Sequence, residues 1–117
     1  MDGAGWTPHD LGVARMMLTV RRPYHLKAEE ARAWLQEQAS DLIGIAGVRT
    51  VVVSRLGAAG GRWEAEFDWL LELELDDGAD PTSIVRDEVC ASLLGDLRLL
   101  GMRPSLAVPR EAWREER

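Results

Sequence analysis

The chain has 117 residues, of which 46% are hydrophobic and 29% charged, and its net charge is −6. This length suits one domain that buries roughly two-thirds of the surface of its unfolded chain. The acidic balance argues against nucleic-acid binding, because phosphate recognition needs clustered positive charge, whereas the arginines here are scattered. No apolar run approaches the ~20 residues that span a bilayer, so no membrane segment is expected.

Cysteine usage and the N-terminal residues bear on the compartment. Cys90 is the only cysteine, so an intrachain disulfide and a CxxC metal site are both excluded. The first residues lack a basic region followed by an apolar one, so no secretory signal is expected. These features together predict a reduced, cytoplasmic setting. HExxH, phosphate-loop and metal-ligand patterns are missing from the sequence, so we expect no metal and no cofactor.

The N-terminal part of the chain predicts an arm, a strand and a helix. Residues 1–12 have no hydrophobic period and are interpreted as an arm, whereas residues 13–20 alternate as a strand does. Pro23 ends that strand because it lacks an amide donor. From 26 to 42 the apolar residues recur every three to four positions, which predicts an amphipathic helix. No Ser, Thr, Asn or Asp caps its start.

Two further strands are predicted next to each other. Residues 49–56 are short and β-branched, and a glycine-rich stretch, 57–61, leads into residues 63–77, which alternate for about a dozen residues. Strands joined in this way form a hairpin. The apolar face of the long strand consists of Phe67, Trp69, Leu71, Leu73 and Leu75.

The C-terminal part predicts a second helix and a last strand. Asp80 suits the N-cap and Pro81 the first helical position. The apolar stripe of this helix consists of Val85, Val89, Leu93, Leu97 and Leu100. The helix ends at Gly101 or, alternatively, at Gly95. A short strand at 105–108 follows, and residues 109–117 are a charged tail that frays.

The order strand, helix, strand, strand, helix, strand predicts a domain over residues 13–108. With right-handed crossovers it closes into a four-stranded antiparallel sheet with both helices on one face, the ferredoxin-like βαββαβ arrangement of an α+β fold.

Two helices cover only one face of such a sheet. The other face is expected to carry Met17, Leu70, Val51, Val53, Glu66, Asp68, Glu72, Glu74, Arg15, Arg21, Arg49 and Arg55. Opposite charges on adjacent strands can pair across it. This face is either solvated or packed on a second copy about a two-fold axis. The middle strand exceeds the length that the short last strand can pair, which favours the homodimer.

Two segments resemble known proteins. Gly44-Ile-Ala-Gly-Val48 resembles the Gly-Ile-Pro-Gly-Val turn of stress-responsive A/B barrel domains, and the strand that begins at Phe67-Asp-Trp69 is similar to their Tyr-Asp-led third strand. The resemblance covers residues 13–108. It implies a dimeric α+β barrel, a superfamily that includes cofactor-independent monooxygenases, small cyclases, isomerases and ligand-sensing domains. Arg15 replaces the histidine that many A/B barrel domains carry on the first strand.

Candidate functional residues gather where the first strand passes into the first helix. His25 can titrate near neutrality and act as a general base, with Tyr24 beside it as a hydrogen-bond donor. The alternative for His25 is helix capping or solvent exposure. A sheet–helix cleft for a small apolar or aromatic ligand is expected to be lined by Met16, Trp34, Trp63, Phe67 and Trp69. The alternative is that Trp34 and Trp69 simply meet in the core.

Other reactive groups predict structure rather than chemistry. Glu66 and Asp68 share a face, and pairing with Arg15 or Arg21 is expected for them. Cys90 has no base positioned beside it and is expected in or near the core. Two functions remain open: a homodimer that binds, and in the enzyme case converts, a small apolar molecule, or a non-catalytic dimerisation, sensor or stress-associated module.

Overall fold

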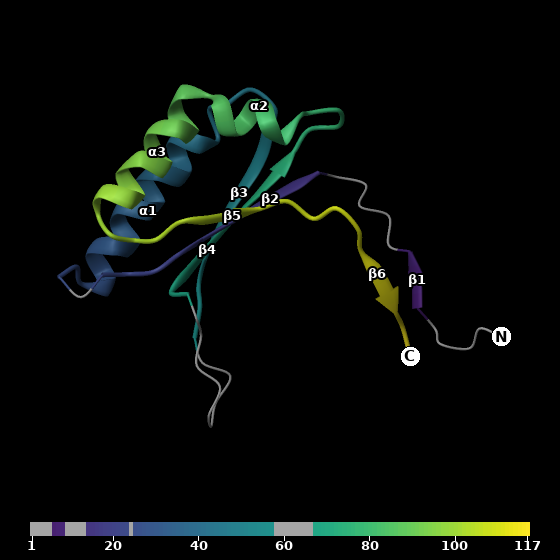
Figure 1. Cartoon of the computed structure of the whole chain (residues 1–117), viewed down its shortest axis with the longest axis horizontal. Coiled ribbons are helices and arrows are strands. Elements are labelled where there is room, and N and C mark those ends of the chain that lie inside the picture. The colour runs from purple at the N-terminus through teal and green to yellow at the C-terminus, as the bar shows by residue number, and fades with distance from the viewer. Residues whose placement is uncertain (1–5, 9–13, 24, 58–66) are drawn as a thin grey trace.

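The computed structural model describes residues 6–8, 14–23, 25–57 and 67–117. Within these ranges the elements in chain order are β1 (Trp6–Pro8), β2 (Arg15–Val20), α1 (Ala28–Leu42), β3 (Val48–Arg55), β4 (Trp69–Leu75), α2 (Pro81–Arg86), α3 (Glu88–Leu99), β5 (Ser105–Ala107) and β6 (Trp113–Glu115). Strands β3, β4, β2 and β5 form one antiparallel sheet in that order, and β1 pairs with β6 in a separate sheet (Figure 1).

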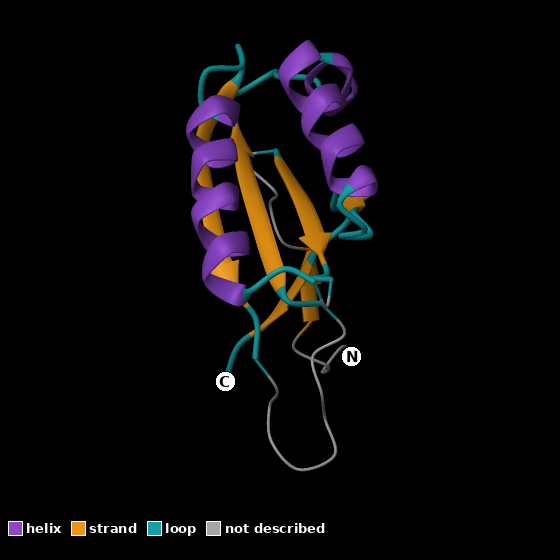
Figure 2. Cartoon of the chain, turned by 90° about the vertical axis from the view of Figure 1, so that its left-hand side faces the viewer, coloured by secondary structure: helices purple, strands orange, loops and turns teal. Residues whose placement is uncertain are grey.

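The four-stranded sheet confirms the predicted fold class. Its order places the first and third strands of the βαββαβ unit in the centre, which is the ferredoxin-like arrangement. Figure 2 shows the helices on one side of the strands. The molecule is therefore an α+β fold with one face of its sheet covered by helices, whereas no helix of the described residues covers the other.

Strand β4 supplies the centre of the hydrophobic core. Trp69 is 4% exposed, and Leu71, Leu73 and Leu75 are equally well buried, so the apolar face predicted for this strand is confirmed. Strand β2 pairs with it in register, with Leu18 opposite Leu71. Burying a leucine side chain stabilises a fold by roughly 1.5–3 kcal/mol, so this row of side chains anchors the domain.

Helix α1 begins and ends close to its predicted bounds. Lys27 occupies the N-cap without a side-chain hydrogen bond, as expected from the missing cap residue, and Glu29 and Glu30 lie in the first turn. Ala31 and Leu35 are among the residues that it buries against the sheet. After the helix, Gly47 adopts φ +94°, a conformation that favours glycine, and its carbonyl accepts from the amide of Asp76 at 2.8 Å.

The faces predicted for β3 are wrong. Val51 and Val53 pack against the core, opposite Leu73 and Leu71, and it is Val52 that lies on the uncovered face. The pairing with β4 shifts between Val48 and Thr50, where an irregularity inserts one extra residue. Such a bulge moves every following side chain to the opposite face of the sheet.

The predicted second helix is broken in two. Asp87 is extended, with φ −60° and ψ 142°, and its carboxylate accepts from the amide of Val89 at 2.9 Å. The buried residues are therefore Ile84 in α2 and Cys90, Leu93 and Leu97 in α3, rather than a stripe through Val85 and Val89. The predicted start is confirmed, because Asp80 accepts from the amide of Thr82 at 3.0 Å. Of the two predicted ends, the one at Gly101, with φ +75°, is observed.

The short strands β1 and β6 were not expected, because neither segment shows a strand pattern. They pair antiparallel, with Trp6 opposite Glu115 and Pro8 opposite Trp113. This pairing joins the segments interpreted as arm and tail. In Figure 1 the two strands stand apart from the helices and the main sheet.

The break at Asp87 generates a prediction about stability. Asp87→Ala removes the side-chain acceptor that starts α3, and we expect the free energy of unfolding to fall by about 1 kcal/mol. Urea denaturation measures this change. Asp96→Ala, at an exposed position within α3, is the matched control and should change stability by no more than about 0.5 kcal/mol. Equal losses in the two variants would contradict a capping role for Asp87.

Candidate functional site

The residues predicted to line a ligand cleft lie at different depths. Met16 is 0% exposed in the middle of β2, and Trp69 is buried opposite Val20. Trp34, on α1, is half-buried and packs against the core. Phe67 is half-buried just before β4 begins. Trp63 lies outside the described residues.

The candidate base lies beside the β2-to-α1 connection. His25 is exposed, and Tyr24 lies outside the described residues. The amide of Asp68 donates to the carbonyl of Val20 at 2.9 Å, and its carboxylate accepts from the amide of Arg22 at 2.6 Å. These bonds bring the start of β4 against the end of β2. The expected pairing of Asp68 with an arginine side chain is not found among the described residues, where its carboxylate accepts from a backbone amide instead, and Glu66 lies outside them.

The connection itself is held by short-range hydrogen bonds. The guanidinium of Arg22 donates to the carbonyl of Leu26 at 2.6 Å, and the amide of Leu26 donates to the carbonyl of Pro23 at 3.1 Å. His25 lies on the connection that follows the end of β2 at which Val20 pairs with Trp69. This is the end at which the sequence predicts the ligand cleft.

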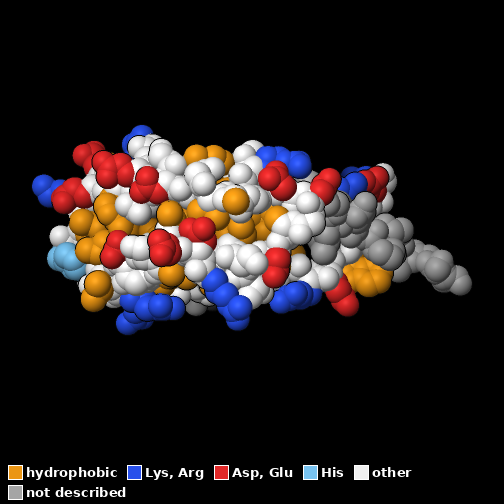
Figure 3. Space-filling view, turned by 90° about the horizontal axis from the view of Figure 1, so that it is seen from above, with side chains coloured by type: hydrophobic (Ala, Val, Ile, Leu, Met, Phe, Trp, Pro, Cys, Tyr) orange, Lys and Arg blue, Asp and Glu red, His pale blue; other side chains and the backbone are white. Residues whose placement is uncertain are grey.

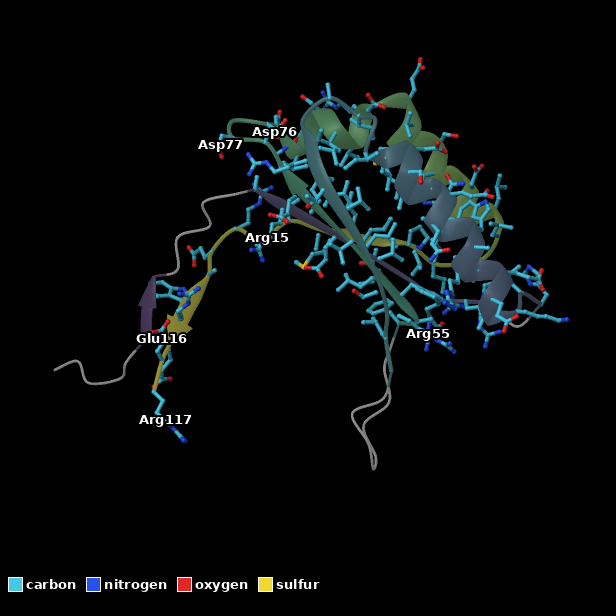
Figure 4. The ribbon with its side chains drawn as sticks, turned by 180° about the vertical axis from the view of Figure 1, so that it is seen from behind. Arg15, Arg55, Asp76, Asp77, Glu116 and Arg117 are labelled. Carbon is cyan, nitrogen blue, oxygen red and sulfur yellow. The ribbon has the colours of Figure 1, made fainter. Side chains whose placement is uncertain are left out.

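The uncovered side of the main sheet, here called the open face, is the second candidate site. From the register with the buried residues, its side chains are Arg15, Met17 and Thr19 from β2, Leu70, Glu72 and Glu74 from β4, Thr50, Val52 and Ser54 from β3, and Ser105 and Ala107 from β5. It mixes apolar and charged groups. Figure 4 shows the sheet from behind, with Arg15 and Arg55 at opposite ends of it.

A hollow of about 170 Å³ lies on the open face. It is lined by Arg15, Val52, Glu72, Leu73 and Glu74. Val52 is 49% exposed there, and the hydroxyl of Thr50 donates to the carboxylate of Glu74 at 2.9 Å. Within the described part of the chain neither Arg15 nor Glu72 forms an ion pair. The hollow thus offers a positive group, negative groups and an apolar wall to an incoming surface.

A larger hollow, of about 350 Å³, lies between α1 and α3. Its lining is Gln38, Asp41, Glu88, Val89, Ser92 and Leu93. Figure 3, which views the molecule from above, shows apolar side chains exposed between acidic ones. The lining holds carboxylates and the Ser92 hydroxyl but no histidine that could activate that hydroxyl, so we assign no chemistry to it.

The nucleophilic and metal-binding options are limited among the described residues. Cys90 is 5% exposed, which confirms its expected place in the core. Burial, and then the nearby Asp87 carboxylate, raise the pKa of its thiol, whereas a catalytic thiol needs a lowered pKa. In this part of the chain no group of three His, Cys, Asp or Glu side chains could hold a metal ion, and no helix is long and apolar enough to cross a bilayer.

Comparison with known proteins yields a structural likeness. No protein-family model matches the chain, and neither does a curated protein. The crystal structure of an ethyl tert-butyl ether D (EthD) family protein from Bacillus halodurans C-125 superposes with a TM-score of 0.64 at 17% identity, covering 86% of this chain and 99% of that one. The likeness establishes the fold that the two chains share: a ferredoxin-like α+β domain.

The raised pKa of Cys90 generates a prediction about pH dependence. The unfolded thiol ionises near pH ~8.5 and the native thiol only above that. The unfolded state therefore binds fewer protons in this range, and native stability falls as pH rises through it. Cys90→Ala should lose less stability than wild type between about pH 7 and pH 10 in urea denaturation. Equal losses of unfolding free energy in the two proteins would contradict a raised pKa of the Cys90 thiol.

Proposed function

We propose that the protein is a homodimeric α+β barrel in which the open faces of two subunits pack against each other. The observation that carries this proposal is the composition of the open face: Met17, Leu70 and the 49%-exposed Val52 lie among charges of both signs. An exposed sheet face of this kind is typical of an interaction surface. The resemblance to dimeric α+β barrel proteins, and to stress-responsive A/B barrel domains among them, supports it.

Two-fold symmetry suits the charges of this face. In an isologous interface the same patch meets itself, so each subunit must offer both members of every pair. Arg15 supplies a positive group, and Glu72 and Glu74 supply negative groups in the same hollow. Packing of two open faces allows Arg15 of each subunit to meet a carboxylate of the other, and Arg15 has no ion-pair partner among the described residues of its own subunit.

The dimer is tested by Leu70→Arg. Leu70 is half-buried on the open face, opposite Thr19 and Ser54, so an arginine there leaves the core intact while placing two like charges in the interface. We expect wild type to sediment as a dimer and Leu70→Arg as a folded monomer. Leu99→Arg is the control, because Leu99 is 87% exposed on α3, and it should remain dimeric. A Leu70→Arg dimer of unchanged mass would reject this interface.

We further propose that each subunit binds a small apolar or aromatic molecule between the sheet and the helices, where β2 passes into α1. The half-buried Trp34 and Phe67 and the buried Trp69 are aromatic, and aromatic side chains suit a planar ligand. His25 acts as the base, while Tyr24 donates a hydrogen bond and Trp63 forms the rim on sequence grounds. The reaction class is that of a cofactor-independent monooxygenase, cyclase or isomerase.

One observation favours the second candidate, a non-catalytic dimerisation, sensor or stress-associated module. Met16 and Trp69 are almost wholly covered by other side chains of the same subunit. A ligand that reaches them must displace part of the core. A protein that only dimerises, and binds no small molecule there, requires no such displacement. The presence or absence of a bound molecule separates the two candidates.

The ligand proposal is tested by releasing bound small molecules from the purified dimer and identifying them by mass spectrometry. On a substrate found in this way, His25→Ala should lower kcat by about 10²-fold or more, the usual contribution of a general base. His9→Ala replaces the other histidine of the chain and should leave kcat unchanged. Full activity of His25→Ala would remove this residue from the mechanism, and a dimer that carries no molecule supports the non-catalytic candidate.

A further inference from the structure

The strands β1 and β6 form a two-stranded sheet separate from the main sheet. We call this pair the terminal ribbon. Each strand has three residues, and a two-stranded sheet is at best marginally stable by itself in water. All residues of β6 are exposed, and Trp113 is 58% exposed. Burial of the large apolar surface of a tryptophan stabilises a protein or an interface. An exposed tryptophan on a short strand is therefore a candidate contact to another molecule.

The ribbon lies on the side of the open face. Figure 1 shows the helices on one side of the main sheet and the ribbon beyond the other, and Figure 4 shows the same arrangement from behind, with Glu116 and Arg117 across from the sheet. The radius of gyration is 16.3 Å, whereas a compact domain of this length has about 13 Å. The difference is consistent with a ribbon that stands outside the packed body.

The size of the open face indicates which partner covers the ribbon. Strands β2, β3, β4 and β5 have six, eight, seven and three residues, so at the usual rise and spacing they present roughly 400 Å² in projection. A stable interface buries about 800 Å² per partner. The projection of one open face is about half of that area, so contacts from elements beside the sheet would enlarge the interface. The ribbon is the described element that projects on this side.

We infer that the terminal ribbon packs against the second copy of the chain, with Trp113 as the main contact residue. This inference rests on the proposed homodimer and adds the segment that completes its interface. A second copy is favoured over an unrelated partner for two reasons. The ribbon is placed on the same side as the open face, and, like that face, it carries both signs of charge, in Arg114 and Glu115 of β6.

The contact between the terminal ribbon and the second copy is tested first by Trp113→Ala. Buried tryptophans commonly dominate interface energies, so we expect the dimer dissociation constant, measured by sedimentation at several concentrations, to rise roughly tenfold or more. The circular dichroism of the monomer should not change, since Trp113 is exposed in the subunit. Leu99→Ala, at an exposed apolar position on α3, is the matched control and should leave the dissociation constant unchanged.

A photo-crosslink shows directly whether the terminal ribbon contacts its own chain or the second copy. The photoreactive residue benzoylphenylalanine is placed at position 113 or, as the control, at position 99, and isotopically heavy and light chains are mixed before illumination. The inference predicts crosslinked peptides that join a heavy and a light chain at position 113 but not at position 99. These crosslinks should disappear when the chains also carry Leu70→Arg. Crosslinks confined to one chain, with a Trp113→Ala dissociation constant equal to that of wild type, overturn this inference while the open-face dimer stands. A wild type that is monomeric overturns both.

Discussion

The period of two along β4 is the constraint on which the structure depends. Because successive side chains point to opposite faces, the residues from Trp69 to Leu75 that enter the core force Leu70, Glu72 and Glu74 to the other side. The helices cover the first set, and no helix of the described chain covers the second. The core is therefore complete in one subunit, whereas the open face is left to interact with something else.

The alternation of β4, the change of period at α1 and the capping pair Asp80-Pro81 are each local signals, and together with element order they were enough to predict the ferredoxin-like fold. Features that arise from the pairing of two distant segments could not be predicted from the sequence of either segment. The irregularity near Arg49 exchanges the faces of β3, because it arises from how β3 is paired with β4 rather than from its own sequence. Asp87 interrupts a helical pattern that is otherwise continuous, because its side chain competes for a backbone amide.

The candidate sites show the same limit. Burial of Trp69 and of Cys90 follows from periodicity and residue type, and both were predictable. The hollow formed by Arg15, Val52, Glu72, Leu73 and Glu74 was not, because it brings three strands together and depends on the shifted register of β3. The pairing of β1 with β6 joins opposite ends of the chain, and segments of three residues carry too little pattern to reveal it.

The core and the open face divide the proposed roles within the subunit. The packed residues around Met16 hold the sheet and helices together, whereas the open face and the ribbon expose side chains, Val52 and Trp113, whose burial would stabilise an assembly. The proposed interface does not include the exposed His25, which lies in the β2-to-α1 connection. Dimerisation and ligand binding can thus occur in one molecule without competing for the same residues.

Hydroxyl-radical footprinting of Met17 tests the central claim most directly. Met17 is half-buried on the open face and its neighbour Met16 is 0% exposed in the core, so the two methionines compare the faces within one strand. If a second copy covers the open face, Met17 is oxidised slowly in wild type and several-fold faster in Leu70→Arg, while Met16 stays protected in both. Equally fast oxidation of Met17 in the two proteins would contradict the account.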